Sequence, residues 1–125
     1  MSVLKILLPT TLGILPYDGK ECVYVLTGLT YRQYVVVHRV VQVPNVSSSP
    51  EKTFAVLKSD VSRIKGSLTP PEIVLGYAHT HPYPYYAPSF EDIEGIATGM
   101  IGLVVCNDSY EFYNSDGLIA TKTLR

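Results

Sequence analysis

Four polar residues in one short stretch have the types and spacing to bind a metal ion. His79 and His81 are two residues apart and follow the apolar run Ile73–Ala78, which predicts a buried strand. Residues two apart on a strand point to the same face, so both imidazoles can converge at the end of this strand. Ser89 and Asp92 follow shortly afterwards. Two neutral imidazoles and one carboxylate form a ligand set that suits zinc.

Each part of this stretch also has a purely structural interpretation. Three prolines exclude a continuous helix before Ser89, and a helix is expected to begin there. Ser89 is a good N-cap residue, and Asp92 falls three positions later, as in a capping box. His79 and His81 could likewise be polar residues at the end of a strand. The residues alone leave open whether Asp92 caps a helix or joins the imidazoles.

The complete spacing resembles the metal motif of the JAMM (MPN+) metalloprotease family, H-[ST]-H-P-x6-S-x2-D. The matching residues are His79-Thr80-His81-Pro82, then Ser89 and Asp92, after the lead-in Gly76-Tyr77-Ala78. Upstream, Glu21 followed by an apolar segment that ends at Gly28 is similar to the glutamate segment of that family. The resemblance extends from about Glu21 to the C-terminus.

This resemblance implies a role for each residue of the site. His79, His81 and Asp92 would hold one zinc ion per chain, with a water molecule in the fourth position. Glu21 would act as general base, and Ser89 would stabilise a tetrahedral oxyanion. The implied reaction is hydrolysis of an amide or isopeptide bond without a covalent intermediate. Without the motif, Glu21 would be an exposed residue at the start of a strand.

Composition indicates one globular domain spanning residues 1–125. The chain is 46% hydrophobic and 17% charged, which is enough apolar material for a core. A formal net charge of −1 implies no general attraction to nucleic acid or to an anionic membrane. The N-terminal apolar segment is too short for a signal peptide or a membrane span. Cys22 and Cys106 lie in apolar runs and are expected to be buried thiols of a cytoplasmic, reducing compartment.

The order of predicted elements indicates an α+β or mixed α/β sandwich around one sheet, and the resemblance implies a cytidine-deaminase-like αβα layout. His38 lies in the clearest strand and is interpreted as a structural histidine, not as a metal ligand. The segment Pro44–Lys52 is expected to be a polar loop, either a mobile surface loop or an insertion that faces a substrate or partner. Strands are expected at Val3–Leu8 (or the start of a helix there), Cys22–Leu26, Tyr31–Val43, Thr53–Leu57, Ile73–Ala78, Ile101–Cys106 and on both sides of the turn Asn114–Gly117. Helices are expected at Thr10–Leu15, from Ser59 to Lys65, and at Asp92–Met100.

The function indicated is a zinc metallopeptidase or isopeptidase acting near the C-terminal tail of a protein or peptide. The resemblance to compact prokaryotic or phage members suggests a ubiquitin-like or sulfur-carrier protein as a possible partner. We expect an extended substrate to pass the tyrosine-rich segment Tyr83–Tyr86, although these tyrosines could instead cover the core. The alternatives are a catalytically silent MPN-type binding or assembly module and a zinc hydrolase of a small molecule.

Overall fold

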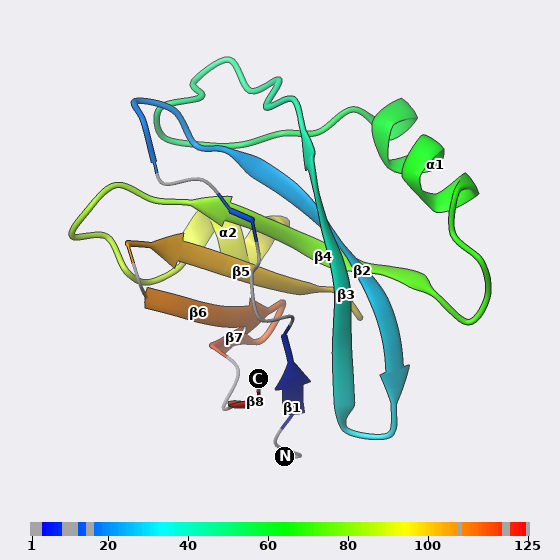
Figure 1. The fold of residues 1–125 in the computed structure, drawn as a ribbon. Helices are drawn as coiled ribbons and strands as arrows, with labels where there is room; N and C mark the ends of the chain where they lie inside the picture. The colour runs from blue at the N-terminus through cyan, green and yellow to red at the C-terminus, as the bar shows by residue number, and fades with distance from the viewer. Residues whose placement is uncertain (1–3, 9–12, 15–16, 108, 119–120, 125) are drawn as a thin grey trace.

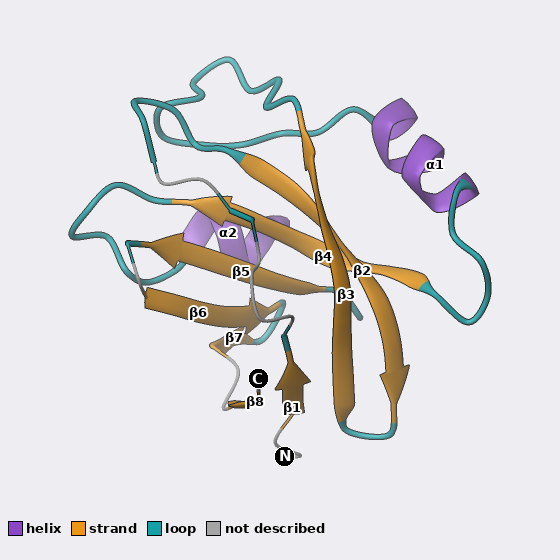
Figure 2. Cartoon of the chain, in the orientation of Figure 1, coloured by secondary structure: helices purple, strands orange, loops and turns teal. Residues whose placement is uncertain are grey.

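The structure, a computed structural model, describes residues 4–8, 13–14, 17–107, 109–118 and 121–124. Strands and helices alternate irregularly along the chain, as expected for an α+β protein (Figure 2). The strands are β1 (Leu4–Leu7), β2 (Val23–Tyr31), β3 (Tyr34–Val43), β4 (Ile73–Thr80), β5 (Ile101–Cys106), β6 (Ser109–Asn114), β7 (Gly117–Leu118) and β8 (Thr121–Leu124). The helices are α1 (Lys58–Gly66) and α2 (Phe90–Gly95).

All of these strands belong to one mixed sheet of eight strands in the order β7-β6-β5-β4-β2-β3-β1-β8. Strand β4 lies in its interior, antiparallel to β2 and parallel to β5. Strands β1 and β8 join the sheet through parallel pairs, β1 with β3 and β8 with β1. Segments near both ends of the chain therefore lie next to each other, as Figure 1 shows. The predicted α+β class with a single sheet is confirmed.

The two faces of the sheet bury different apolar clusters. On β2, Tyr24 and Leu26 belong to one cluster, and the alternate residues Val23 and Val25 belong to the other. Both described helices lie over the Val23 face. Ile64 of α1 packs into that cluster. Residues of α2 line a hollow together with Tyr77, and Tyr77 packs against the same cluster. The site therefore develops on the face that carries both described helices.

Strand β2 is longer than the sequence indicated. Gly28–Thr30 was expected to be a link, but these residues continue β2 to Tyr31, which pairs with Tyr34 at the start of β3. Only Arg32 and Gln33 form the turn, and Arg32 adopts a positive φ of 57°. In two-residue hairpin turns, positions with a positive φ are normally occupied by Gly or Asn, which makes such turns recognisable in a sequence. Without that signal, the prediction placed the turn too early.

The predicted strand at Thr53–Leu57 is wrong, because this extended segment pairs with no strand in the described part of the chain. It is held mainly by Asn45. The Asn45 side chain donates to the Thr53 carbonyl at 3.0 Å and accepts from the Ala55 N–H at 3.1 Å. The Val46 N–H also donates to the Ala55 carbonyl at 2.9 Å. The segment is therefore fixed in an extended form by the loop before it.

Both helices differ from prediction at one end. Helix α1 begins after Leu57, which supplies no side-chain cap, so the predicted cap at Ser59-Asp60 lies two to three residues too late. Helix α2 does begin after Ser89, and its capping box with Asp92 is present. It ends at Gly95, because Ile96 is already extended, and the predicted helix to Met100 is wrong. Glycine disfavours helix strongly enough to outweigh the apolar spacing of this segment.

The remaining expectations concern the chain ends and the cysteines. The first strand is confirmed as β1, whereas the predicted helix at Thr10–Leu15 falls mostly outside the described residues. Cys106 is buried as expected, but Cys22 is only half-buried, and both thiols are free. None of the helices that the structure describes is long and apolar enough to cross a membrane.

Candidate metal centre

The two histidines lie at the C-terminal end of β4 with their imidazoles together. The backbone N–H of Thr80, between them, donates to the Cys22 carbonyl at 3.1 Å, and the Thr80 hydroxyl accepts from the Cys22 N–H at 2.9 Å. These bonds tie the end of β4 to the start of β2 and leave both imidazoles on the same side of the strand. His79 is fully buried and His81 is 7% exposed. Their Nε2 atoms lie 3.0 Å apart.

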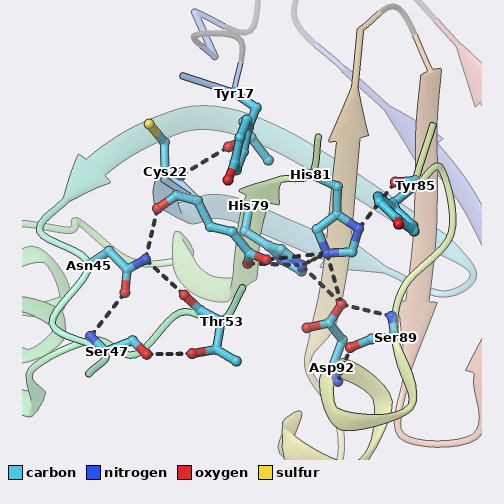
Figure 3. Close-up of polar contacts among 12 residues, drawn as sticks. Tyr17, Cys22, Asn45, Ser47, Thr53, His79, His81, Tyr85, Ser89 and Asp92 are labelled. Carbon is cyan, nitrogen blue, oxygen red and sulfur yellow. Dashed lines mark hydrogen bonds and ion pairs between the residues drawn. The ribbon is translucent and has the colours of Figure 1, made fainter. Parts of the chain in front are cut away.

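Asp92 supplies the third atom of this cluster from the first turn of α2. Its Oδ2 lies 3.1 Å from His79 Nε2 and 3.3 Å from His81 Nε2. The same Oδ2 accepts from the Ser89 N–H at 2.9 Å, so the capping box holds the carboxylate toward the histidines (Figure 3). The capping interpretation and the ligand interpretation of Asp92 are therefore compatible.

The three atoms have the separation that a tetrahedral zinc ion requires. Zinc binds histidine nitrogen and carboxylate oxygen at about 2.0–2.2 Å, which places neighbouring tetrahedral ligand atoms about 3.3 Å apart. The triangle formed by the two Nε2 atoms and Asp92 Oδ2 has sides of 3.0, 3.1 and 3.3 Å. His79, His81 and Asp92 thus fit a zinc ion in both chemistry and spacing.

Hydrogen bonding further orients the His81 ring. Its Nδ1 lies 3.2 Å from the Tyr85 carbonyl oxygen, and donation from Nδ1–H leaves a lone pair on Nε2. His79 Nδ1 has no hydrogen-bond partner among the described residues, and the ring of Phe54 lies over His79 at a centroid distance of 4.4 Å. One imidazole is therefore positioned by a polar contact and the other by aromatic packing.

Glu21 lies just outside this triangle of atoms. It is 3% exposed, and its two carboxylate oxygens are 4.0 Å from His79 Nε2 and 3.8 Å from His81 Nε2. Glu21, His79 and His81 together form a cluster whose potential ligand atoms lie within 4.8 Å of one another. Because Asp92 is nearer to both imidazoles, we assign Asp92 to the ligand triangle and Glu21 to the space beside it. Glu21 Oε1 is buried without a hydrogen-bond partner in the described part of the chain.

The backbone of Glu21 is fixed by the loop that precedes the Thr53 segment. The Glu21 N–H donates to the Pro50 carbonyl at 2.7 Å, and the Glu21 carbonyl accepts from Asn45 Nδ2 at 2.8 Å. Asn45 therefore joins Glu21 to the extended segment at Thr53 and Ala55. Sequence analysis treated Pro44–Lys52 only as a polar loop, because a lone asparagine carries no signal of such distant contacts.

Burial and close contacts shift the pKa values of the ionisable groups at the centre. Burial lowers the pKa of His81, but contacts with Asp92 and Glu21 outweigh it, so the net shift is upward. Burial raises the pKa of Glu21 to about 7, an effect that the nearby His81 opposes and the Asp92 charge reinforces. Burial also disfavours the charged form of Asp92, but hydrogen bonds with His79 and His81 outweigh it and hold the pKa of Asp92 below its ordinary range. Burial lowers the pKa of His79, which favours the neutral imidazole that a metal needs.

Ser89 lies at the junction of two hollows beside the centre. Its Oγ accepts from the Asp92 N–H at 3.1 Å, which leaves the hydroxyl proton free to donate elsewhere. The first hollow, here called the Ile96 hollow, has a volume of about 590 Å³ and includes Asp92 and Tyr113 in its wall. The second, the Tyr85 hollow, has about 500 Å³ and includes Glu21 and His81. Among the residues that the structure describes, only Lys52 and Ser89 line both hollows.

The tyrosine-rich segment faces solvent. Tyr83, Tyr85 and Tyr86 are 67%, 66% and 40% exposed, so they do not form a cover over the core. Tyr85 lines the hollow that contains Glu21, whereas the rings of Tyr83 and Tyr86 pack edge to face at 5.8 Å. His38 also behaves as the sequence suggested. Its Nδ1 lies 3.1 Å from Glu72 Oε2, and it takes no part in the metal-binding cluster.

The structure thus brings together all of the predicted site residues, Glu21, His79, His81, Ser89 and Asp92. Sequence analysis did not single out Asn45, Phe54 or Tyr113. Tyr113 is 1% exposed, and its ring lies edge-on to that of His79 at 6.2 Å. Burial, assisted by the Asp92 and Glu21 charges, raises its pKa beyond the ordinary range. Alternation along its strand places Tyr113 on the same face as Glu111, so the sequence pattern does not signal its burial beside the site.

Comparisons with known proteins bear on the fold. No family model matches the chain, and no curated protein matches it. Among solved structures, a Desulfitobacterium hafniense protein is similar with a TM-score of 0.69 and 20% identity, covering 96% of this chain and 93% of its own. A JAB1/MPN domain protein from Archaeoglobus fulgidus is similar over 84% of this chain and 81% of its own, with a TM-score of 0.55 and 22% identity.

A third similar structure is described as a JAMM metalloprotease-like zinc site in the proteasome and signalosome. It covers 99% of this chain and 100% of its own, with a TM-score of 0.50 and 17% identity. Identities this low establish the shared fold and no more. The chain therefore has the fold of JAB1/MPN domain proteins, and the predicted resemblance is confirmed at that level. The Glu21, His79 and His81 cluster also fits the JAMM arrangement.

Proposed function

We propose that this protein is a zinc-dependent metallopeptidase that hydrolyses an amide or isopeptide bond. The observation that carries this proposal is the triangle of His79 Nε2, His81 Nε2 and Asp92 Oδ2, with the buried Glu21 carboxylate 3.8–4.0 Å from the two nitrogens. A bound zinc ion would polarise the scissile carbonyl and make an attacking water more acidic. The chain's own residues would supply the proton transfers and the orientation.

Glu21 is the residue placed to move protons. Its Oε1 is buried, has no hydrogen-bond partner within the described residues and lies at the edge of the ligand triangle. This oxygen would accept a proton from the attacking water and deliver it to the leaving amine. The raised pKa of about 7 in the metal-free protein matches the range in which a carboxylate both accepts and returns a proton.

Ser89 would stabilise the developing negative charge. Its Oγ already accepts one hydrogen bond, from the Asp92 N–H, and its proton remains available for the substrate oxygen. The N–H of Ser89 meanwhile keeps Asp92 turned toward the histidines. One residue thus contributes both to the position of a ligand and to the catalytic surface.

An extended peptide fits the segment that follows Lys52. Thr53 and Ala55 bond to the Asn45 side chain, on the side of the preceding loop. Backbone groups alternate in direction along an extended chain, so those of Phe54 and Val56 point the other way. Neither makes a backbone hydrogen bond within the described part of the chain, and both residues line the Ile96 hollow. A substrate strand could pair here.

These features favour a protein or peptide tail as substrate over a small molecule, because the exposed tyrosines do not close the site. An extended protein or peptide tail is the partner class that we propose. The two free thiols are consistent with action in a reducing compartment such as the cytoplasm.

The experiment is a cleavage screen of the zinc-loaded protein against ubiquitin-like fusions and peptides, beside the Glu21→Gln variant. We expect zinc-dependent cleavage by the native protein and a loss of about 10²–10⁴-fold in kcat for the variant with its zinc retained. Glu94→Gln is the control, because Glu94 is exposed and lines neither hollow. Near-normal kcat in zinc-loaded Glu21→Gln would refute the assignment of the base. Binding of a substrate tail without any turnover would instead identify a silent binding module.

A further inference from the structure

The two hollows beside the metal centre are lined by different carboxylates of the site. Glu21 lines the Tyr85 hollow, and Asp92 lines the Ile96 hollow. Since Ser89 lines both, a peptide that places its scissile carbonyl near the Ser89 hydroxyl extends into one hollow on each side.

The position of Glu21 fixes the direction of that peptide. A general base that first takes a proton from water must then pass it to the leaving amine, so the amine has to lie near Glu21. The amine side of the substrate therefore occupies the Tyr85 hollow. The acyl side, which contains the residue that supplies the scissile carbonyl, occupies the Ile96 hollow.

The Ile96 hollow is large enough for a bulky side chain and has an apolar lining. Its volume of about 590 Å³ is within the range of pockets that enclose small organic groups. Apolar and aromatic side chains form much of its wall, namely Phe54, Val56, Tyr77, Ile96 and Tyr113. Its charged groups, Lys52, Glu91 and Asp92, come from the loop and from the first turn of α2.

Packing beneath the hollow keeps this wall in place. Tyr113 pairs with Gly102 on the neighbouring strand, and a Cβ atom at position 102 would collide with the Tyr113 ring. The ring therefore lies flat against the sheet, which explains its burial beside His79. The hollow thus has an aromatic base that packs directly on the sheet.

We propose that the Ile96 hollow is a specificity pocket for a large aliphatic or aromatic side chain on the acyl side of the scissile bond. This inference rests on the proposed peptidase function and names the class of substrate. A tail that ends in glycine would leave the pocket empty. A tail with leucine or phenylalanine at that position would fill it and remove apolar surface from water.

The test uses peptides that are identical except for glycine, alanine, leucine or phenylalanine at the residue that supplies the carbonyl. With the zinc-loaded protein, we expect kcat/KM for the leucine or phenylalanine peptide to exceed that for the glycine peptide by about 10- to 100-fold. Equal values across the series would overturn the proposal.

A pair of glycine substitutions supplies a matched control. Gly95 lines the hollow, and a Cβ atom built there meets no atom within 4 Å. Gly95→Phe should narrow the pocket and reduce the phenylalanine-to-glycine ratio of kcat/KM at least several-fold. Gly66 has the same open surroundings but ends α1, away from the hollow, so Gly66→Phe should leave the ratio unchanged. Equal ratios in both variants and the native protein would contradict the assignment. Ile96→Ala, which removes part of the wall, should also lower the preference.

A binding measurement separates failure of the pocket from failure of the proposed function. Calorimetry with zinc-loaded Glu21→Gln compares the affinities of the phenylalanine and glycine peptides. If no peptide is cleaved but the phenylalanine peptide binds tighter, and Gly95→Phe in the same background abolishes the difference, the pocket stands and the peptidase proposal fails. Equal affinities refute the pocket whatever the outcome of the cleavage assay.

Discussion

The Asp92 carboxylate belongs at once to a helix cap and to the cluster of potential metal-binding atoms. Its Oδ2 accepts the Ser89 N–H at 2.9 Å and lies within 3.3 Å of both imidazole nitrogens. Four of the five candidate site residues share a short stretch with fixed spacing, which is why the sequence could identify them. Glu21 lies far upstream in sequence, and only the family resemblance suggested its place. The structure supplies its physical basis, a buried carboxylate held by the 45–50 loop.

At the residue scale, substitutions can separate the two roles of Ser89, as a helix cap and as a hydrogen-bond donor to the substrate. Ser89→Ala removes both the cap, worth about 1 kcal/mol, and the donor, whose loss should lower kcat by about 10²–10³-fold. Ser89→Asp restores a capping oxygen but no donor, whereas Ser89→Thr retains both. We therefore expect thermal stability to return in both replacements and activity to return only in Ser89→Thr. Full activity in Ser89→Asp would eliminate the oxyanion role.

At the scale of elements, the strands were more predictable than the connections between them. Runs of apolar and β-branched residues indicated the core of the sheet, including β4 and β5, because these strands are buried on both faces. The sequence did not reveal that Thr53–Leu57 lacks a partner strand, since pairing depends on which elements lie alongside. It also did not reveal that Asn45 connects this segment to Glu21, because those contacts cross up to 24 positions of the chain.

Asn45→Ala tests this connection. Its side chain makes four hydrogen bonds, to Glu21, Ser47, Thr53 and Ala55. Their loss should destabilise the protein by about 1–3 kcal/mol in chemical unfolding and lower kcat/KM, because both Glu21 and the substrate-facing segment are released. Asn114→Ala is the control, since Asn114 makes one exposed turn contact to the Asp116 N–H. Similar effects of the two substitutions would show that Asn45 has no special role.

At the scale of the whole molecule, folding buries the Glu21 carboxyl, so ionisation of this group at higher pH lowers the stability of the metal-free protein. The folded-state pKa of Glu21 is raised from 4.5 to about 7, so the metal-free folded protein retains a proton that the unfolded chain releases. The contribution of Glu21 to the free energy of unfolding is fully favourable below pH 4.5. It is lost progressively as the pH rises toward 7 and stays constant above that value.

This loss of stability with rising pH predicts how the thermal stability of the metal-free protein differs from that of its Glu21→Gln variant. Glutamine cannot ionise, so the Tm of the variant relative to the native protein should increase between pH 5 and pH 8. Titratable groups distant from Glu21 cancel in the comparison, whereas His81 and Asp92 interact with Glu21 and contribute to the difference. Calorimetric unfolding in the presence of a chelator measures both proteins. A Tm difference independent of pH would show that Glu21 ionises normally in the folded state.

The central claim is that His79, His81 and Asp92 hold one zinc ion, and metal analysis of the purified protein tests it most directly. Native mass spectrometry and elemental analysis should find about one zinc per chain in the native protein and in Glu21→Gln, because Glu21 lies outside the ligand triangle. His79→Ala and His81→Ala should lose the zinc or bind it far more weakly, whereas His38→Ala should retain it. Unchanged zinc content in both His79→Ala and His81→Ala would contradict the account.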